Sequence, residues 1–329
     1  MDYRSLGQTG LLVSTFGFGC GAVGGLLIKG SAKEREIAVA RAIDLGVTYF
    51  DTAAAYGNGQ SEVNLGQALN KIRADVVIGS KIRLETDDLN DIETAVVRLV
   101  DQSLRRLGKD TIDLMQLHNL VGRYRAQQPG WLSIDDINRV LVVFERLQTQ
   151  GKLRYWGING IGDIDAVASC LATKMHSVQI CHNLLNPTAA MAAPKAFPFE
   201  DQGNLIGTAA QKGIGVLAFR VLAGGALSGS AHRVANATGS VETILSSGTY
   251  DLDVRLGQKL SRLIDEGFAE TLVEAAIRFA VGTPGVSSAV IGISSLEQLE
   301  DAVRIANKGA MADGAIDVLR EQWADFITA

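Results

Sequence analysis

Short apolar runs alternate with longer amphipathic segments along most of the chain. The runs have the length of buried strands, and the segments between them have the helical spacing of apolar residues. Strands that alternate with helices predict an α/β fold with a parallel sheet. The expected strands cover residues 15–18, 47–51, 76–81, 112–118, 155–159, 178–183, 215–219 and 289–292. The expected helices cover residues 33–45, 61–71, 91–107, 135–150, 163–173, 202–212, 270–281 and 295–307, with an extra C-terminal helix at 313–327.

Eight strand-helix pairs in one chain close most naturally into a (β/α)8 barrel of the TIM type. Capping signals support the helix starts: Ser31 stands three residues before Glu34, and Ser295 stands just ahead of the last paired helix. No heptad pattern, long low-complexity tract or linker divides the chain. We therefore predict a single domain over residues 1–329.

A glycine pattern near the N-terminus offers a second fold. The stretch from Gly19 to Gly24 spells a dinucleotide-binding fingerprint, and Asp51 follows 27 residues after its last glycine. In a doubly wound fold a helix begins within this fingerprint, so that its amides meet the pyrophosphate. Here residues 25–30 intervene before the cap at Ser31. This late helix start favours the barrel over the doubly wound fold.

Composition narrows the function classes. The chain has 329 residues, of which 47% are hydrophobic and 20% charged, an ordinary soluble composition with material for a large core. A net charge of -5 provides no broad basic surface, so nucleic acid is not an expected partner. Cys20, Cys170 and Cys181 are odd in number and lack metal-ligand spacing, which argues against a disulfide framework or zinc site. They fit a reducing compartment, most simply the cytoplasm.

One uncharged segment has the length of a membrane span. Residues 10–28 contain no charged side chain, but six glycines together with Ser14 and Thr15 interrupt the apolar run. No basic region or convincing cleavage site accompanies it. We expect this segment in the barrel interior and expect no membrane association.

Ionisable side chains stand at the ends of consecutive predicted strands. Asp51 ends the second strand, Lys81 the third and His118 the fourth, and Tyr56 lies in the loop between Asp51 and a helix start expected at Ser61. The C-terminal ends of barrel strands surround one mouth, so the four side chains Asp51, Tyr56, Lys81 and His118 are expected to converge there.

The motifs around these residues resemble the aldo-keto reductase family over essentially the whole chain. They are Phe-Asp-Thr-Ala at 50–53, Tyr-Gly at 56–57 and Ser-Glu-x-x-Leu-Gly at 61–66. The resemblance implies an eight-stranded barrel whose floor is closed by a short N-terminal hairpin. It implies hydride exchange between a nicotinamide cofactor and a small-molecule carbonyl or alcohol: an aldehyde, ketone or aldose. It also implies that Asp51, Tyr56, Lys81 and His118 are the catalytic residues.

The residue types fit these roles. A phenol has a pKa of about 10, and an ammonium within hydrogen-bond distance is expected to lower it. Asp51 is expected to hold Lys81, so that Tyr56 acts as general acid in reduction and general base in oxidation. His118 would place a hydrogen bond on the carbonyl oxygen. Each residue also has a structural interpretation as a cap, packed aromatic, surface ion pair or core imidazole, but together these require four coincidences at one mouth.

The resemblance also implies cofactor contacts at the strand ends. Gln179 matches a glutamine that binds the carboxamide, and Asn159 stands one place from the usual Ser-Asn pair. Phe219 keeps a flat face for stacking on nicotinamide. Gly19 and Cys20, together with Asp51, are expected to line the same site.

The phosphate and adenosine contacts are expected on later loops. The segment 220–229 resembles the pyrophosphate loop, with Arg220, Leu222 and Gly224 as contacts; Arg220 either contacts phosphate or covers the rim. For adenosine, the contacts implied are Gly292, Ser294, Gln298 and Asp301. Family members that prefer NADP commonly carry Lys or Arg near the first three of these positions, which are uncharged here. This absence tilts the expected coenzyme of an NAD(P)(H) site modestly to NAD, and hence the reaction to dehydrogenation.

Two other functions remain to be separated from this one. The same barrel serves in the family as a channel-associated regulatory β subunit, which would bind nicotinamide with little turnover. A metal-dependent barrel isomerase would need several ligands at strand ends, where only Asp51 and His118 qualify clearly, so we expect no metal. The substrate and the choice between monomer and homo-oligomer stay open.

Overall fold

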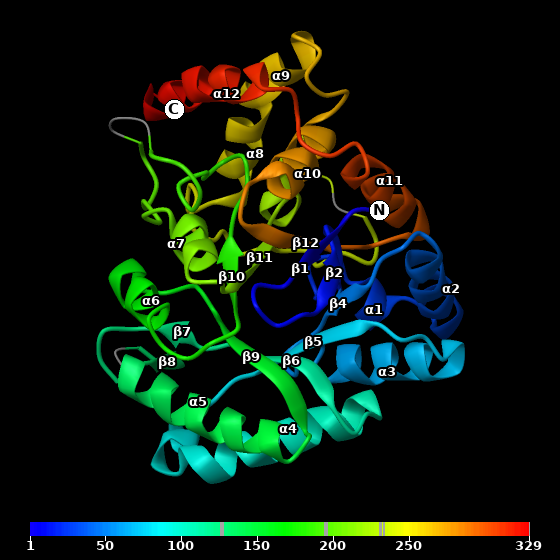
Figure 1. The fold of residues 1–329 in the computed structure, drawn as a ribbon. Coiled ribbons are helices and arrows are strands. Elements are labelled where there is room, and N and C mark those ends of the chain that lie inside the picture. Colours follow the sequence, from blue (N-terminus) through cyan, green and yellow to red (C-terminus); the bar gives the residue numbers. More distant parts are fainter. Residues whose placement is uncertain (126–127, 194–196, 230–231, 233, 329) are drawn as a thin grey trace.

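Eight parallel strands form a closed barrel in the computed structural model, which describes residues 1–125, 128–193, 197–229, 232 and 234–328 (Figure 1). Around the ring the order is β10-β11-β12-β3-β4-β5-β6-β9, so strands that follow one another in this set lie side by side. Pairing of β3 with β12 closes the ring, which confirms the (β/α)8 prediction and excludes the doubly wound alternative. In chain order the barrel strands are β3 (Phe16–Gly19), β4 (Tyr49–Asp51), β5 (Val77–Ile82), β6 (Ile112–Leu117), β9 (Leu153–Asn159), β10 (Ser177–Cys181), β11 (Gly215–Phe219) and β12 (Val286–Gly292).

A helix follows each barrel strand and packs outside the ring. Every predicted strand and helix overlaps its counterpart, with ends that differ by at most three residues. The Ser31 side chain accepts from the Glu34 amide in a complete capping box, and Ser295 caps its helix as predicted. The crossover helices are α2 (Ala32–Asp44), α3 (Gln60–Ile72), α4 (Ile92–Leu107), α5 (Ile134–Thr149), α6 (Ile164–Cys170), α7 (Leu205–Gln211), α10 (Leu272–Gly282) and α11 (Leu296–Ala306), and α12 (Gly314–Ala324) is the extra C-terminal helix.

Strand periodicity decides which side chains point into the barrel, because successive residues of a strand face opposite sides. On β4, Tyr49 packs among the interior residues, whereas Phe50 joins the large apolar core between strands and helices. The next residue, Asp51, therefore faces inward again. The same alternation on β5 turns Ser80 outward and Lys81 inward.

An N-terminal hairpin closes the floor of the barrel, as expected. β1 (Tyr3–Ser5) pairs antiparallel with β2 (Leu12–Ser14), and its turn lies against the start of β11, where the Gln8 amide donates to the Gly213 carbonyl at 3.0 Å. Leu6, Leu11 and Val13 pack into the barrel interior. Figure 1 shows the hairpin in dark blue at the centre of the ring.

The predicted start signal of the second crossover helix is wrong. α3 begins at Gln60, and the residue before it, Gly59, has a left-handed conformation with φ 86° and no side chain to cap the helix. Ser61 lies inside the first turn, and its hydroxyl donates to the Cys20 carbonyl at 2.9 Å and lies 2.8 Å from the Thr52 hydroxyl. The serine therefore joins the helix to the barrel instead of capping it.

The segment between β11 and α10 contains several short helices, among them α8 (Tyr250–Gln258), η3 (Lys259–Ser261) and α9 (Arg262–Asp265). η2 (Ala223–Ser228) follows the strand, and α8, η3 and α9 precede α10. Together with α12 and the α10 face, α8 and α9 enclose a second apolar cluster. The short elements outside the barrel repeat are α1 (Leu26–Lys29), η1 (Thr86–Asn90), β7 (Leu120–Val121), β8 (Trp131–Leu132), α8 (Tyr250–Gln258), η3 (Lys259–Ser261), α9 (Arg262–Asp265) and η4 (Asp325–Thr328).

Within the ranges given above, no helix has both the length and the apolar composition that crossing a bilayer requires. The same part of the chain holds no group of three or more His, Cys, Asp or Glu side chains placed to bind a metal ion.

The contact between α3 and α4 generates a stability prediction. A Cβ on Gly66 would lie 2.2 Å from the Leu107 carbonyl oxygen, a backbone atom that cannot rotate away. Replacing a helix-interior glycine by alanine gains about 1 kcal/mol of helix propensity, whereas overpacking costs about 1–3 kcal/mol. Because the contact here is with backbone, we expect Gly66→Ala to lower the free energy of unfolding by about 1–2 kcal/mol, as measured by urea denaturation.

The matched control is Gly239→Ala, where a Cβ would meet no atom within 4 Å. We expect this variant to unfold at the same urea concentration as the parent. A Gly66→Ala protein as stable as the control would mean that α3 and α4 lie farther apart than described.

Candidate active site

The structure brings the four predicted catalytic side chains to the C-terminal mouth of the barrel. Asp51 is the last residue of β4, Lys81 lies on β5, and His118 follows directly after β6. Tyr56 lies in the loop between β4 and α3. Its ring contacts the imidazole of His118 edge to face, with centroids 5.7 Å apart.

Lys81 is the centre of the group and is fully buried. Its Nζ donates to Asp51 Oδ1, to the Thr52 carbonyl oxygen at 2.9 Å and to the Tyr56 hydroxyl oxygen at 3.3 Å. An ammonium has three N–H donors and no acceptor, so these three partners satisfy it completely. The Tyr56 oxygen accepts from Lys81, and the phenolic hydrogen is consequently free to point toward another acceptor.

The second carboxylate oxygen of Asp51 is also occupied. Oδ2 accepts from the Tyr49 hydroxyl at 3.0 Å and from Gln179 Nε2 at 2.5 Å. Gln179 comes from β10, on the other side of the barrel interior. Asp51 therefore joins β4, β5 and β10 through side chains alone.

Burial and charge act in opposite directions on this cluster. Burial lowers the pKa of Lys81, but the Asp51 carboxylate and Tyr56 raise it by more, so the amine stays an ammonium. Burial raises the pKa of Tyr56, and the lowering by Lys81 does not offset it. The net pKa of Tyr56 therefore lies above its ordinary value, opposite to the direction predicted from the sequence. The predicted effect of Lys81 is present, but burial outweighs it.

His118 is uncharged at neutral pH. Burial, and then the positive charges of Lys81 and Arg83, lower the pKa of His118 to about 3. Its backbone amide donates to the Ile82 carbonyl at 2.7 Å, which fixes the residue beside the end of β5. A neutral imidazole carries one N–H donor, so His118 can offer a hydrogen bond without carrying a charge.

Backbone hydrogen bonds hold the loop that carries Tyr56. The Ala54 amide donates to the Lys81 carbonyl at 3.0 Å, and the Ser61 amide donates to the Tyr56 carbonyl at 3.2 Å. Across the mouth, a Cβ on Gly21 would lie 3.3 Å from the Tyr56 ring. The ring is therefore placed between the end of β3 and the first turn of α3.

The predicted nicotinamide contacts stand on neighbouring strand ends. Gly19 ends β3 and Cys20 follows it, where the Cys20 amide donates to the Asp51 carbonyl at 2.9 Å. Asn159 ends β9 and is paired in register with Gln179 on β10, and Phe219 ends β11 with its side chain half-buried. Both Asn159 and Gln179 are nearly fully buried.

Arg220 begins the predicted pyrophosphate loop in a left-handed conformation, with φ 58°. Its carbonyl accepts from Asn183 Nδ2 at 3.1 Å. Leu222 precedes η2, and Ala223, Gly224 and Gly225 all have positive φ. A Cβ on Gly224 would lie 2.8 Å from Arg220 Nη1, so glycine lets the guanidinium lie against the loop backbone.

The predicted adenosine contacts lie at the turn from β12 to α11. Gly292 ends the strand, and the Ser294 amide donates to Gln298 Oε1 at 3.1 Å. Ser294 is buried and its carbonyl accepts from Asn236 Nδ2 at 2.9 Å, so the long loop after η2 crosses to this turn. Asp301 lies one turn farther along α11 and pairs with Arg304 at 3.2 Å. Its carboxylate therefore faces a cation of its own helix.

Two arginines that follow β7 are engaged with acids. Arg123 pairs with Asp163 and Asp165, each at 2.6 Å, and Arg125 pairs with Asp136 at 2.9 Å. Neighbouring carboxylates therefore offset the charges of both arginines.

Sequence reasoning missed two residues that complete the Lys81 cluster. Tyr49 was assigned only to a buried strand, although its place two residues before Asp51 on one strand puts both on the same face. The Thr52 contribution is a backbone carbonyl, and no side-chain pattern marks it. The alternation of side chains along a strand could have identified Tyr49, but not Thr52.

Comparison with known proteins identifies the fold family. The model of the Aldo/keto reductase family matches residues 15–321. L-galactose dehydrogenase of Arabidopsis thaliana is 24% identical, covering 92% of this chain and 87% of that protein. A probable voltage-gated potassium channel subunit beta of the same plant is 26% identical, covering 92% and 90%.

A solved structure shares the architecture. Aldo-keto reductase AKR11C1 from Bacillus halodurans, in its holo form, superposes with a TM-score of 0.70 at 24% identity, covering 98% of this chain and 96% of that one. The match to the family model spans nearly all of the barrel and its helices. The chain belongs to the aldo-keto reductase family of oxidoreductases.

Proposed function

We propose that the protein exchanges a hydride between a nicotinamide coenzyme and a carbonyl or alcohol substrate, with Tyr56 as the general acid and base. The observation that carries this proposal is the contact of the Tyr56 hydroxyl with a buried, fully satisfied ammonium, Lys81. The substrate class is an aldehyde, ketone or aldose and the corresponding alcohols.

The residues at the mouth fit a nicotinamide coenzyme. Two buried amide side chains, Asn159 and Gln179, stand side by side next to the half-buried ring of Phe219, which suits a carboxamide and a flat ring. Arg220 and the left-handed backbone at Ala223–Gly225 suit a diphosphate. When bound, the coenzyme supplies or accepts the hydride.

Tyr56 handles the proton of the reaction. Lys81 donates to the phenolic oxygen, so the phenolic hydrogen is directed to a substrate oxygen in the mouth. Because the pKa of Tyr56 lies above its ordinary value, the hydroxyl keeps its proton throughout the neutral range until a substrate oxygen becomes negative. In the oxidation direction Lys81 stabilises the phenolate that accepts the proton.

His118 and Asp51 support this transfer. Neutral His118 beside the Tyr56 ring offers an N–H to the same substrate oxygen, which stabilises developing negative charge. Asp51 keeps Lys81 charged and oriented through its Oδ1, and is itself held by Tyr49 and Gln179.

We further infer a modest preference for NAD over NADP. Ser294 and Gln298 carry no positive charge, and the Gln298 amide oxygen is already bonded to the Ser294 amide. A 2'-phosphate there would lack the charge-assisted hydrogen bonds that select it. The cytoplasm is the proposed compartment, since three buried thiols fit reducing conditions.

The similarity to a potassium channel β subunit supports a second candidate, a coenzyme-binding regulatory protein. Such a protein would keep the coenzyme site and show little turnover. The assembled set of Tyr56, Lys81, Asp51 and His118 favours the enzyme, and the turnover of the unmodified protein separates the two functions.

The proton-transfer role predicts the behaviour of Tyr56→Phe. Loss of a general acid costs about 10²–10⁴-fold in rate, so kcat is expected to fall by that factor while the Kd of the coenzyme changes less than about twofold. Steady-state reduction of an aldehyde panel and fluorescence titration with coenzyme measure the two quantities. Tyr3→Phe, on the barrel floor, is the matched control and should retain full activity. Appreciable turnover by Tyr56→Phe would remove Tyr56 from the mechanism.

The charge state of His118 predicts a pH profile. Because burial, Lys81 and Arg83 lower the pKa of His118 to about 3, its proton is gained only as the pH falls toward that value. The log of kcat/KM should therefore show no inflection between about pH 5 and 8 that depends on His118. His118→Phe should lower kcat/KM by a constant factor across this range. An inflection near about pH 6.5 that vanishes in His118→Phe would contradict the neutral imidazole.

The coenzyme preference predicts the outcome of separate NADH and NADPH titrations. We expect NADH to bind at least as tightly as NADPH to the parent protein. Gln298→Arg should then tighten NADPH binding roughly tenfold, the value of one charge-assisted hydrogen bond, and leave the Kd of NADH unchanged. Gln67→Arg, which adds the same charge on α3, is the control. A large NADPH preference in the parent would overturn the inference.

A further inference from the structure

A second buried charge lies directly behind the catalytic strand. Glu62, in the first turn of α3, is fully buried, and both of its carboxylate oxygens are engaged. Oε1 accepts from the Ser80 hydroxyl at 2.5 Å, and Oε2 accepts from Arg106 Nε at 2.6 Å. Ser80 immediately precedes Lys81 on β5 and faces outward. One carboxylate thus joins α3, α4 and the strand that carries the catalytic amine.

Arg106 also shapes the end of the loop that carries Tyr56. Its Nη2 donates to Ser103 of α4 at 3.2 Å, which holds the guanidinium against its own helix. A Cβ on Gly59 would lie 2.6 Å from Arg106 Cδ, so the side chain lies directly over the glycine where α3 begins. The position of Arg106 therefore leaves no room for a side chain at residue 59, where the backbone is left-handed.

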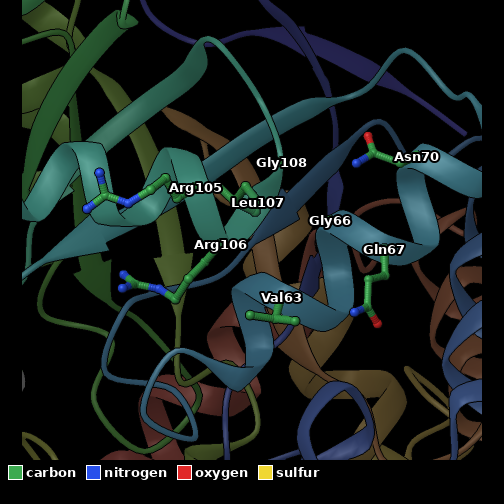
Figure 2. A pocket seen from close by; sticks show the side chains of 8 residues that line it. All are labelled: Val63, Gly66, Gln67, Asn70, Arg105, Arg106, Leu107 and Gly108. Carbon is green, nitrogen blue, oxygen red and sulfur yellow. The ribbon is translucent and has the colours of Figure 1, made fainter.

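A groove between α3 and α4 lies along this contact. Figure 2 shows Val63, Gln67 and Asn70 of α3 on one side of it and Arg105 and Arg106 of α4 on the other. The groove contains none of the residues proposed for chemistry. Arg106 is about one quarter exposed along it, and Glu62 beneath is sealed from solvent.

The first turn of α3 has further anchors on the barrel. Ser61 donates to the Cys20 carbonyl at 2.9 Å, and Asn64 Nδ2 donates to the Leu27 carbonyl at 2.7 Å. The N-terminal end of α3 is thus hydrogen-bonded to the residue after β3, to α1, to β5 and to α4. Tyr56 lies four residues before this turn, and its carbonyl accepts from the Ser61 amide. A displacement of the turn therefore moves Tyr56 relative to Lys81.

We propose that Glu62 and Arg106 are positioning residues, which hold the Tyr56 loop at hydrogen-bond distance from Lys81 by fixing the first turn of α3 to β5 and α4. The inference rests on the proposed function, because it concerns the geometry of the proposed proton donor. A buried carboxylate without its cation is expensive, so loss of Arg106 forces the turn to rearrange. The chemistry is sensitive to such movement, since a displacement of about 1 Å at a reacting group costs up to about 10²-fold in rate.

The test uses Arg106→Met, Arg106→Lys and Ser80→Ala in the full-length protein. For Arg106→Met we expect kcat of carbonyl reduction to fall roughly tenfold, with the Kd of NADH unchanged within about twofold. Arg106→Lys, which restores a cation to Glu62, should recover at least part of kcat. Arg105→Met, which changes an exposed arginine on the same helix, is the matched control and should behave as the parent. Ser80→Ala removes only the hydroxyl that donates to Glu62, and it replaces Arg106→Met in the test if that variant fails to fold.

Crystal structures of the variants test the positioning role without a measurement of turnover. We expect the distance from Lys81 Nζ to the Tyr56 hydroxyl to exceed the 3.3 Å of the parent. Parent-like kcat and an unchanged distance in a folded variant, even one with a lower melting temperature, would overturn the positioning role. A parent protein that binds NADH but reduces no carbonyl would instead contradict the proposed function, while the distance still decides the positioning role.

Discussion

The burial of one ammonium group constrains the whole site. Removing an ion from water costs on the order of several kcal/mol, and Lys81 is fully buried. Three hydrogen-bond acceptors offset this cost: the Asp51 carboxylate, the Thr52 carbonyl oxygen and the Tyr56 hydroxyl oxygen. Each acceptor must stay in place, because a buried N–H without a hydrogen-bond partner costs free energy. The closed ring of strands supplies the rigidity this requires.

The same charge sets the state of its neighbours. Lys81 opposes the effect of burial on Tyr56 and adds to the effect of burial on His118, because one neighbour titrates to an anion and the other to a cation. A buried carboxylate, Asp51, keeps the ammonium charged. Two neutral hydrogen-bond donors, the phenol and the imidazole, consequently face the mouth above a charge pair that solvent does not reach.

Much of this arrangement follows from the sequence, and the exceptions have physical reasons. Strands and crossover helices are encoded locally by apolar spacing, so their places and the convergence of the four residues were predictable. The contact of Gln179 with Asp51 joins residues 128 positions apart, and no local pattern encodes it. At Ser61 the sequence resembles a cap, but the helix begins one residue earlier, after a left-handed Gly59 at which a side chain would collide with Arg106 of α4. Likewise, the polar segment before α8 is held by the buried Asp253, which accepts from Ser246 and Ser247.

The two halves of the barrel hold different kinds of groups. The strands β4 and β5 carry the buried pair Asp51 and Lys81, whereas β9, β10, β11 and β12 end in Asn159, Cys181, Phe219 and Gly292. Gln179 connects the two groups of strands, because it lies on β10 and its Nε2 donates to Asp51 at the end of β4. A ligand that accepts or donates at Gln179 would therefore act on Asp51, and through it on the ammonium beneath Tyr56. This connection is an electrostatic route from β10 to the hydroxyl of Tyr56 that needs no movement of the backbone.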